Sequence, residues 1–97
     1  MATYIALANY TDQGIRALSS APDRIDAARK LVESFGGELK AFYLTMGGYD
    51  IVSIMEAPDD ETAARIALLL GSAGNVRTTT LRAFTEDEFR TIVSEIS

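Results

Sequence analysis

The residues best suited to chemistry form a short turn made of Gly47, Gly48, Tyr49 and Asp50. Glycines let backbone N–H groups approach a ligand closely, and the neighbouring tyrosine and aspartate add a phenol and a carboxylate. The same residues suit a structural turn, in which the glycines, Gly48 included, take positive φ angles and the aspartate accepts backbone N–H bonds. Both roles stay open, and they are compatible if the turn borders a pocket.

A second polar group lies in the segment 75–80. Arg77, like Arg82, could hold a carboxylate through its forked guanidinium, and Thr78 adds a hydroxyl. Tyr43 could line a cavity with its ring. The structural alternatives are an edge strand guarded by charges and ordinary aromatic packing. We predict that the turn, Tyr43, Arg77 and Thr78 bind a small-molecule ligand.

The usual catalytic and metal-binding side chains are missing. The 97 residues include no His and no Cys, which excludes disulfides, thiolate chemistry and imidazole-ligated haem or zinc. Serine nucleophiles would lack a histidine partner, so hydrolase chemistry is not expected. Glu56 is a candidate for proton abstraction because it lies in an apolar segment, where burial would raise the pKa of its carboxyl; its structural alternative is to face water or pair with an arginine. The acids 59–61 suit the first turn of a helix, so we expect no metal and no cofactor.

Composition narrows the classes of partner. Fourteen acidic residues against nine basic ones give a net charge of -5, whereas nucleic acid binding requires a basic surface. No apolar run reaches the roughly 18 residues of a membrane helix, and the first residues do not begin a signal peptide. With 47% hydrophobic and 24% charged residues, we expect one cytoplasmic domain over residues 1–97, without membrane contact.

The pattern along the chain predicts the elements that position these residues. Short β-branched and aromatic segments indicate strands, and amphipathic segments between capping residues and glycines indicate helices. Ser20 is expected to cap the first long helix, Thr85 and Glu88 form a capping box, and Thr11 or Asp12 begins a short helical turn. The glycines at 47–48 predict a tight hairpin. The expected strands are 3–10, 38–46, 50–57 and 76–84, and the expected helices are 20–35, 58–70 and 85–96.

The order of these elements is that of the ferredoxin-like α+β fold, βαββαβ, with an extra C-terminal helix. In that fold the first and third strands lie in the middle of the sheet, and Lys40, Arg77 and Arg82 would protect its edges. Phe84 and the last helix should close one end of the core or reach a partner subunit.

The apolar content of the strands predicts self-association. Two helices cover one face of such a sheet, and a face left in water should be polar. The segments 38–46 and 50–57 are instead apolar at nearly every position. We therefore expect the second face to pack against another copy, in a homodimer or larger oligomer. Simple alternation places Leu39, Ala41 and Tyr43 on one face and Phe42, Leu44 and Met46 on the other.

The hairpin segment resembles a known family. FYLTMGGYD, residues 42–50, is similar to the signature of the GYD-domain family, and the segments 11–16 and 74–89 resemble the same family. The resemblance covers nearly the whole chain. It implies a dimeric α/β-barrel, in which two ferredoxin-like sheets face each other, and a family with no assigned reaction.

A weaker similarity is to the effector-binding domains of Lrp/AsnC transcription regulators, through Gly47, Tyr49, Asp50 and the segment 75–80. It implies a module that senses small molecules or amino acids and assembles. No helix-turn-helix precedes it in this sequence, so DNA binding is not expected.

Three functions stay open. The first is an oligomeric module that binds a small, acidic or aromatic metabolite near the hairpin 47–50 and the subunit interface. The second, suggested by resemblance in fold, is a cofactor-independent monooxygenase or isomerase. The third is a structural oligomerisation protein. The lack of histidine favours binding over catalysis.

Overall fold

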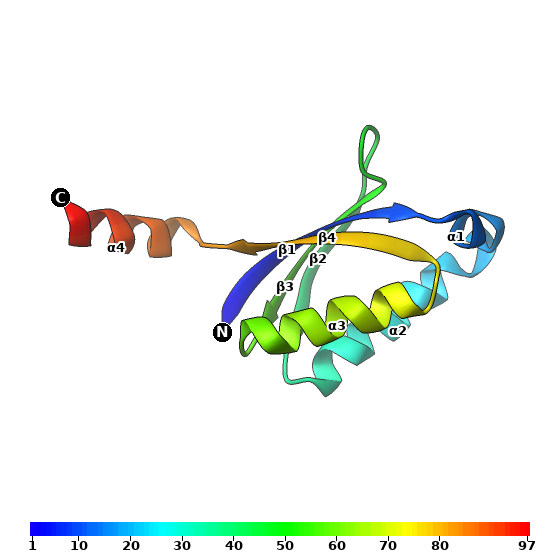
Figure 1. Ribbon diagram of the computed structural model, residues 1–97, viewed down its shortest axis with the longest axis horizontal. Helices are drawn as coiled ribbons and strands as arrows, with labels where there is room; N and C mark the ends of the chain where they lie inside the picture. The colour runs from blue at the N-terminus through cyan, green and yellow to red at the C-terminus, as the bar shows by residue number, and fades with distance from the viewer.

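A four-stranded antiparallel sheet carries two long helices on one face (Figure 1). The computed structural model describes all 97 residues. Every expected strand and helix is present, with small differences at the ends. The elements are β1 (Ala2–Tyr10), α1 (Asp12–Arg16), η1 (Leu18–Ser20), α2 (Ala21–Ser34), β2 (Glu38–Leu44), β3 (Ile51–Ala57), α3 (Asp60–Ser72), β4 (Val76–Ala83) and α4 (Glu86–Ile96).

The sheet has the strand order β2-β3-β1-β4, as the ferredoxin-like fold requires. The apolar strands β1 and β3 therefore pair with neighbours on both sides, and Tyr4 lies between Met55 of β3 and Arg82 of β4. The edge strands are β2 and β4, which carry Lys40, Arg77 and Arg82 as expected. The prediction of an α+β, ferredoxin-like fold is confirmed.

The predicted alternation of β2 is wrong because the strand contains a bulge. Leu39 pairs with Met55, but the next partner of β3, Ile54, pairs with Ala41, so Lys40 is an extra residue. An extra residue shifts every later side chain to the opposite face. Leu39 and Phe42 therefore both face the helices, while Ala41 and Tyr43 face away from them.

The helix starts follow from their capping residues, with one exception. Asp59 accepts the Thr62 N–H at 2.8 Å and begins α3, and Thr85 with Glu88 forms the complete capping box of α4. Ser20 occupies the expected N-cap position of α2, but its hydroxyl makes no capping bond and donates instead to the Ala17 carbonyl of the segment before η1. No helix combines the length and hydropathy needed to cross a membrane.

The tightly packed core occupies one end of the interface between sheet and helices. Its buried members come from the start of β1, the end of β3, the end of α2 and the first half of α3. They are Tyr4, Val32, Met55, Ala57, Ala63 and Ile66. Beyond this core the same interface is hollow, and Val32, Met55 and Ile66 of the core also line the hollow part.

Helix α4 makes no contribution to this core. In Figure 1 it continues beyond β4 and away from the sheet and the other helices. None of its residues is buried, although Phe89, Ile92, Val93 and Ile96 give it an apolar side. The expectation that the last helix closes the core is therefore wrong, and its alternative, contact with a partner subunit, stays a prediction.

Candidate functional site

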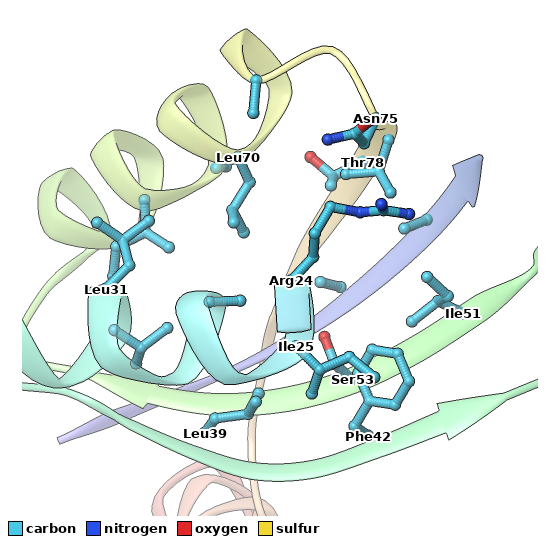
Figure 2. Close-up of a pocket in the computed structure, with 18 of the residues that line it drawn as sticks. Arg24, Ile25, Leu31, Leu39, Phe42, Ile51, Ser53, Leu70, Asn75 and Thr78 are labelled. Atoms are coloured by element: carbon cyan, nitrogen blue, oxygen red, sulfur yellow. The ribbon is translucent and has the colours of Figure 1, made fainter. Parts of the chain in front are cut away.

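A cavity of about 420 Å³ lies between the sheet and helices α2 and α3 (Figure 2). Its volume falls within the range of roughly 300–1,000 Å³ that is typical of small-molecule sites. The cavity exists because alanines face one another across the interface: Ala6 and Ala8 on β1, Ala28 on α2 and Ala67 on α3. Of the 24 lining residues, 19 are hydrophobic.

Arg24 is the only charged residue of the lining. Figure 2 shows its side chain leaving α2 toward Asn75 and Thr78, at the start of β4. The remaining polar lining residues are Ser53 and Thr80. The cavity thus has an apolar interior with a guanidinium, an amide and a few hydroxyls, which are groups that bind and orient a ligand.

The Arg24 guanidinium is fixed by neutral oxygen atoms. Its Nη1 donates to the Ala17 carbonyl at 2.8 Å and to the Ser20 hydroxyl at 2.7 Å, and its Nη2 donates to the Gly14 carbonyl at 3.4 Å. Arg29, by contrast, forms an ion pair with Asp26, and Arg24 forms none. The charge of Arg24 therefore has a fixed position and no carboxylate partner.

Near the polar end of the cavity, α1 and its cap Thr11 dock on the segment leading into β4. Thr11 donates its N–H to the Asn75 carbonyl at 3.0 Å and its hydroxyl to the Gly74 carbonyl at 2.5 Å. Gln13 donates to the Asn75 side-chain oxygen at 3.1 Å. A Cβ on Gly14 would collide with the Asn75 carbonyl, so this approach requires glycine.

The residues that the sequence singled out for ligand binding lie in three places. Thr78 lines the cavity. Arg77 and Tyr43 lie on the opposite face of the sheet, which no helix covers. Gly47, Gly48 and Tyr49 belong to the exposed loop 45–50, which extends beyond the sheet between β2 and β3 (Figure 1). The structure brings only Thr78 to the cavity, and a ligand role for the others stays a prediction.

The hairpin is a longer loop than the tight turn expected from its glycines. Thr45 closes the loop, because its N–H donates to the Asp50 carbonyl at 2.8 Å and its hydroxyl to the Tyr49 carbonyl at 2.5 Å. Gly47 has a φ of 135°, whereas Gly48 has no positive φ. The expectation of a positive φ at Gly48 is therefore wrong, and Gly47 is the position that needs glycine.

Asp50 connects this loop to the end of β1. Its carboxylate Oδ2 accepts the N–H of Tyr10 at 2.9 Å, and its own N–H donates to the Ala8 carbonyl at 2.9 Å and to the Asn9 side-chain oxygen at 3.2 Å. The sequence suggested that Asp50 accepts bonds from its own turn. The partner is instead the neighbouring strand, which continues the pairing of β1 with β3 by one further step.

The remaining candidates for chemistry lie away from the cavity. Glu56 is 4.0 Å from the ammonium of Lys40. Asp59 caps α3, and hydrogen bonds from Thr62 hold the pKa of its carboxyl below the usual value. Asp60 accepts the Tyr4 hydroxyl at 2.5 Å. Burial and this hydrogen bond raise the pKa of Tyr4 to about 12.

Arg82 belongs to that same cluster of Tyr4 and Asp60. Its guanidinium lies 3.9 Å from the Asp60 carboxylate and 4.5 Å above the centre of the Phe84 ring. Arg82 does not line the cavity described above. It lines a separate, open hollow with Asp59, Asp60 and Glu61, whose negative charges would repel a carboxylate. The arginine that does line the cavity, Arg24, was missed. A signal was present, since Arg24, Ala28 and Leu31 follow helical spacing on one face.

Comparison with known proteins agrees with the resemblance seen in the sequence. The GYD domain family model matches residues 4–93. A Thermus thermophilus protein named glutamine synthetase and cystathionine beta-lyase binding protein is 42% identical over 84 residues, which cover 86% of this chain and 88% of the relative. The crystal structure of TTHA0845 from the same organism shares the fold, with a TM-score of 0.56 at 23% identity, over 88% of this chain and 95% of that chain. The family match and the curated relative show that this chain belongs to the GYD domain family.

Proposed function

We propose that this GYD-domain protein binds a small molecule in the cavity between the sheet and helices α2 and α3. The observation that carries the proposal is the cavity of about 420 Å³, with 19 hydrophobic residues among the 24 that line it. An unfilled cavity lowers the stability of a fold, so alanines at facing positions are costly unless a ligand fills the space. A bound molecule would restore those lost contacts.

The polar groups of the lining support binding more than catalysis. They are the Arg24 guanidinium, the Asn75 amide and the hydroxyls of Ser53, Thr78 and Thr80. None of these is a general base at neutral pH, and a hydroxyl nucleophile needs an adjacent base. In this proposal the loop 45–50 has a supporting role, because its Asp50 holds the end of β1 against β3 beside the cavity.

A matched pair of α3 variants tests the proposal. Ala67 lines the cavity and Ala64 is exposed on the same helix, so Ala67→Leu extends a larger side chain into the cavity and Ala64→Leu does not. Native mass spectrometry of freshly purified protein should show a bound small molecule in the wild type and in Ala64→Leu, and none in Ala67→Leu. A wild type without a ligand, or an Ala67→Leu variant that retains it, contradicts the proposal.

We also propose that the chain forms a homodimer or larger oligomer through the face of the sheet that no helix covers. That face carries apolar side chains on each of the central strands. They are Ile5 and Leu7 on β1 and Val52 and Ile54 on β3. Tyr43 on the neighbouring strand β2 faces the same way and is 58% exposed. Ile5, Leu7, Val52 and Ile54 are partly exposed, and apolar residues gathered on one accessible surface are typical of an interface between subunits.

Helix α4 supports the same proposal. It has eleven residues, none buried, and isolated helices shorter than roughly 12–15 residues are marginal in water. Its apolar side, with Phe89, Ile92 and Ile96, lacks a partner within its own chain. Sedimentation velocity at low micromolar concentration should report a mass of at least two chains. A single species of 10.5 kDa contradicts self-association.

A second candidate function is association with a metabolic enzyme. The observation that favours it is the relative that is 42% identical and is named a binding protein of glutamine synthetase and cystathionine beta-lyase. Mixing this chain with each of those two enzymes, purified from its own organism, should give a faster-sedimenting complex. An unrelated acidic protein serves as the control. Unchanged sedimentation of both enzymes at tens of micromolar contradicts this function.

A further inference from the structure

Arg24 occupies an unusual position on helix α2. The other charged residues of the helix are exposed: Asp23, Asp26, Arg29, Lys30 and Glu33. Arg24 instead is half-buried and shares a face with Ala28 and Leu31, which also line the cavity. Placing a charge in an apolar lining costs free energy unless an opposite charge or water compensates it. Arg24 is therefore the one charge that the cavity presents to a ligand.

The contacts of Arg24 hold the guanidinium in place without neutralising it. Three neutral oxygens accept from Nη1 and Nη2, on Ala17, Ser20 and Gly14. A guanidinium has five N–H groups, so the Nε–H and a second Nη2–H have no acceptor in the protein. The Nε and Nη2 atoms share one edge of the guanidinium, and two parallel N–H groups on such an edge are the donor arrangement that a carboxylate accepts.

The rest of the lining sets the shape of the matching ligand. Asn75 and Thr78 lie at the end of the cavity toward which Arg24 extends (Figure 2), and they add neutral hydrogen-bonding groups there. The opposite part of the lining is apolar, with Leu31, Leu39 and Leu70. No acidic residue lines the cavity, so nothing in it would attract the amino group of a zwitterion.

We propose that the cavity selects apolar monocarboxylates, with the carboxylate bound by Arg24 and the hydrocarbon part packed between the sheet and helices α2 and α3. The inference rests on the proposed function, namely that the cavity binds a small molecule. It names the chemical class of that molecule and the residue that recognises it. Arg24, and not Arg77 or Arg82, is then the carboxylate-binding arginine of this chain.

A pair of probes of the same shape tests the role of charge. 3-Phenylpropionate and 3-phenylpropanol differ in the carboxylate and share the apolar part. Isothermal titration calorimetry on the wild type should give at least a tenfold lower dissociation constant for the carboxylate. Arg24→Gln should abolish this preference while leaving the affinity for the alcohol within about twofold. Arg29→Gln, on the exposed side of the same helix, should keep the wild-type preference.

A second variant distinguishes carboxylate binding by Arg24 from a purely structural role of this residue. Arg24→Lys keeps the positive charge but not the paired donors, so it should retain part of the preference for the carboxylate. Circular dichroism verifies that each variant is folded. Equal affinity of the two probes in the wild type, an unchanged preference in Arg24→Gln, or binding of neither probe at millimolar concentration overturns the inference.

These outcomes separate the inference from the proposed function. If both probes bind equally and Ala67→Leu excludes both, the cavity binds small molecules and only the assignment to carboxylates fails. If the wild type carries no molecule in native mass spectrometry and binds neither probe, the proposed function fails as well.

Discussion

Asp50 shows how one residue can be assigned a structural role without excluding a functional one. Its carboxylate accepts the Tyr10 N–H, and asparagine would keep an acceptor oxygen at the same position. We therefore expect Asp50→Asn to change the free energy of unfolding by less than about 1 kcal/mol. Asp50→Ala leaves the Tyr10 N–H without its acceptor and should cost roughly 1–3 kcal/mol.

Chemical denaturation of the two Asp50 variants measures this difference. Equal stability of Asp50→Asn and Asp50→Ala would contradict the assigned hydrogen bond. The affinity of the Asp50→Asn protein for the ligand found by native mass spectrometry tests whether Asp50 also takes part in binding. If a stably folded Asp50→Asn protein keeps its affinity for that ligand, the negative charge of Asp50 has no part in binding.

The two glycines of the loop make a second pair of variants. Gly47 has a φ of 135°, which side chains other than glycine rarely adopt, and Gly48 has no such constraint. A Cβ at either position meets no other atom, so the backbone angle alone separates them. We expect Gly47→Ala to lower the free energy of unfolding by roughly 1–3 kcal/mol through strain, and Gly48→Ala to have a much smaller effect. Denaturant titrations that find Gly48→Ala the more damaging of the two would refute this.

At the scale of single residues, the sequence indicated residue types better than residue partners. The Thr85 capping box is local, because its two hydrogen bonds span three positions, and it was predicted correctly. The partner of Asp50 lies 40 positions away, at Tyr10, so no local pattern could indicate it. Arg24 was overlooked because charged residues on a helix usually face water.

At the scale of elements, Tyr4 joins three of them at the packed end of the molecule. It lies on β1, its hydroxyl donates to Asp60 at the start of α3, and Arg82 of β4 lies 5.7 Å from the centre of its ring. Burial and the bond to Asp60 raise the pKa of Tyr4 from 10.0 to about 12. The folded state thus favours the protonated phenol more strongly than the unfolded chain does.

This shift predicts a loss of stability at high pH. The contribution of Tyr4 should be complete below pH 10.0 and should decline as the pH rises toward about 12. Near-ultraviolet absorbance should show a late titration step, near pH 12, that belongs to the Tyr4 phenol. Tyr4→Phe should remove this late step and flatten the corresponding pH dependence. Identical titration curves of the folded wild type and Tyr4→Phe above pH 10.0 would contradict the assignment.

The strands and helices could be predicted from the sequence, but which side chains of β2 point toward the helices could not. Strands and helices follow from the spacing of apolar residues, which the sequence displays directly. A bulge adds one residue to a strand without changing its composition, so the segment around Lys40 gave no signal of it. The consequence is large, because the extra residue decides which of Leu39, Phe42 and Tyr43 face the cavity.

At the scale of the whole molecule, the two faces of the sheet have different roles in the proposed function. The face toward α2 and α3 holds the cavity, and the opposite face holds the proposed interface between copies. The sequence indicated that both faces are apolar, but it could not indicate the cavity. A cavity depends on which alanines meet across the layers, and that depends on packing between residues such as Ala6 and Ala67, which are far apart in the chain.

Phe42 and Tyr43 are adjacent in β2 and lie on these different faces, so substitutions at the two positions test the role of each face separately. Phe42 lines the cavity, and Phe42→Ala should lower the free energy of unfolding by roughly 1–3 kcal/mol while leaving the oligomer intact. Tyr43 is 58% exposed on the uncovered face, and Tyr43→Glu should leave the fold intact while raising the dissociation constant of the oligomer at least tenfold. Such a charge would be buried without a partner between the two sheets. Chemical denaturation measures the free energy of unfolding, and sedimentation velocity measures the oligomeric state of the same samples.

The reverse pattern, with dissociation caused by Phe42→Ala and not by Tyr43→Glu, would place the interface on the helix-covered face. It would refute the roles assigned to the two faces of the sheet.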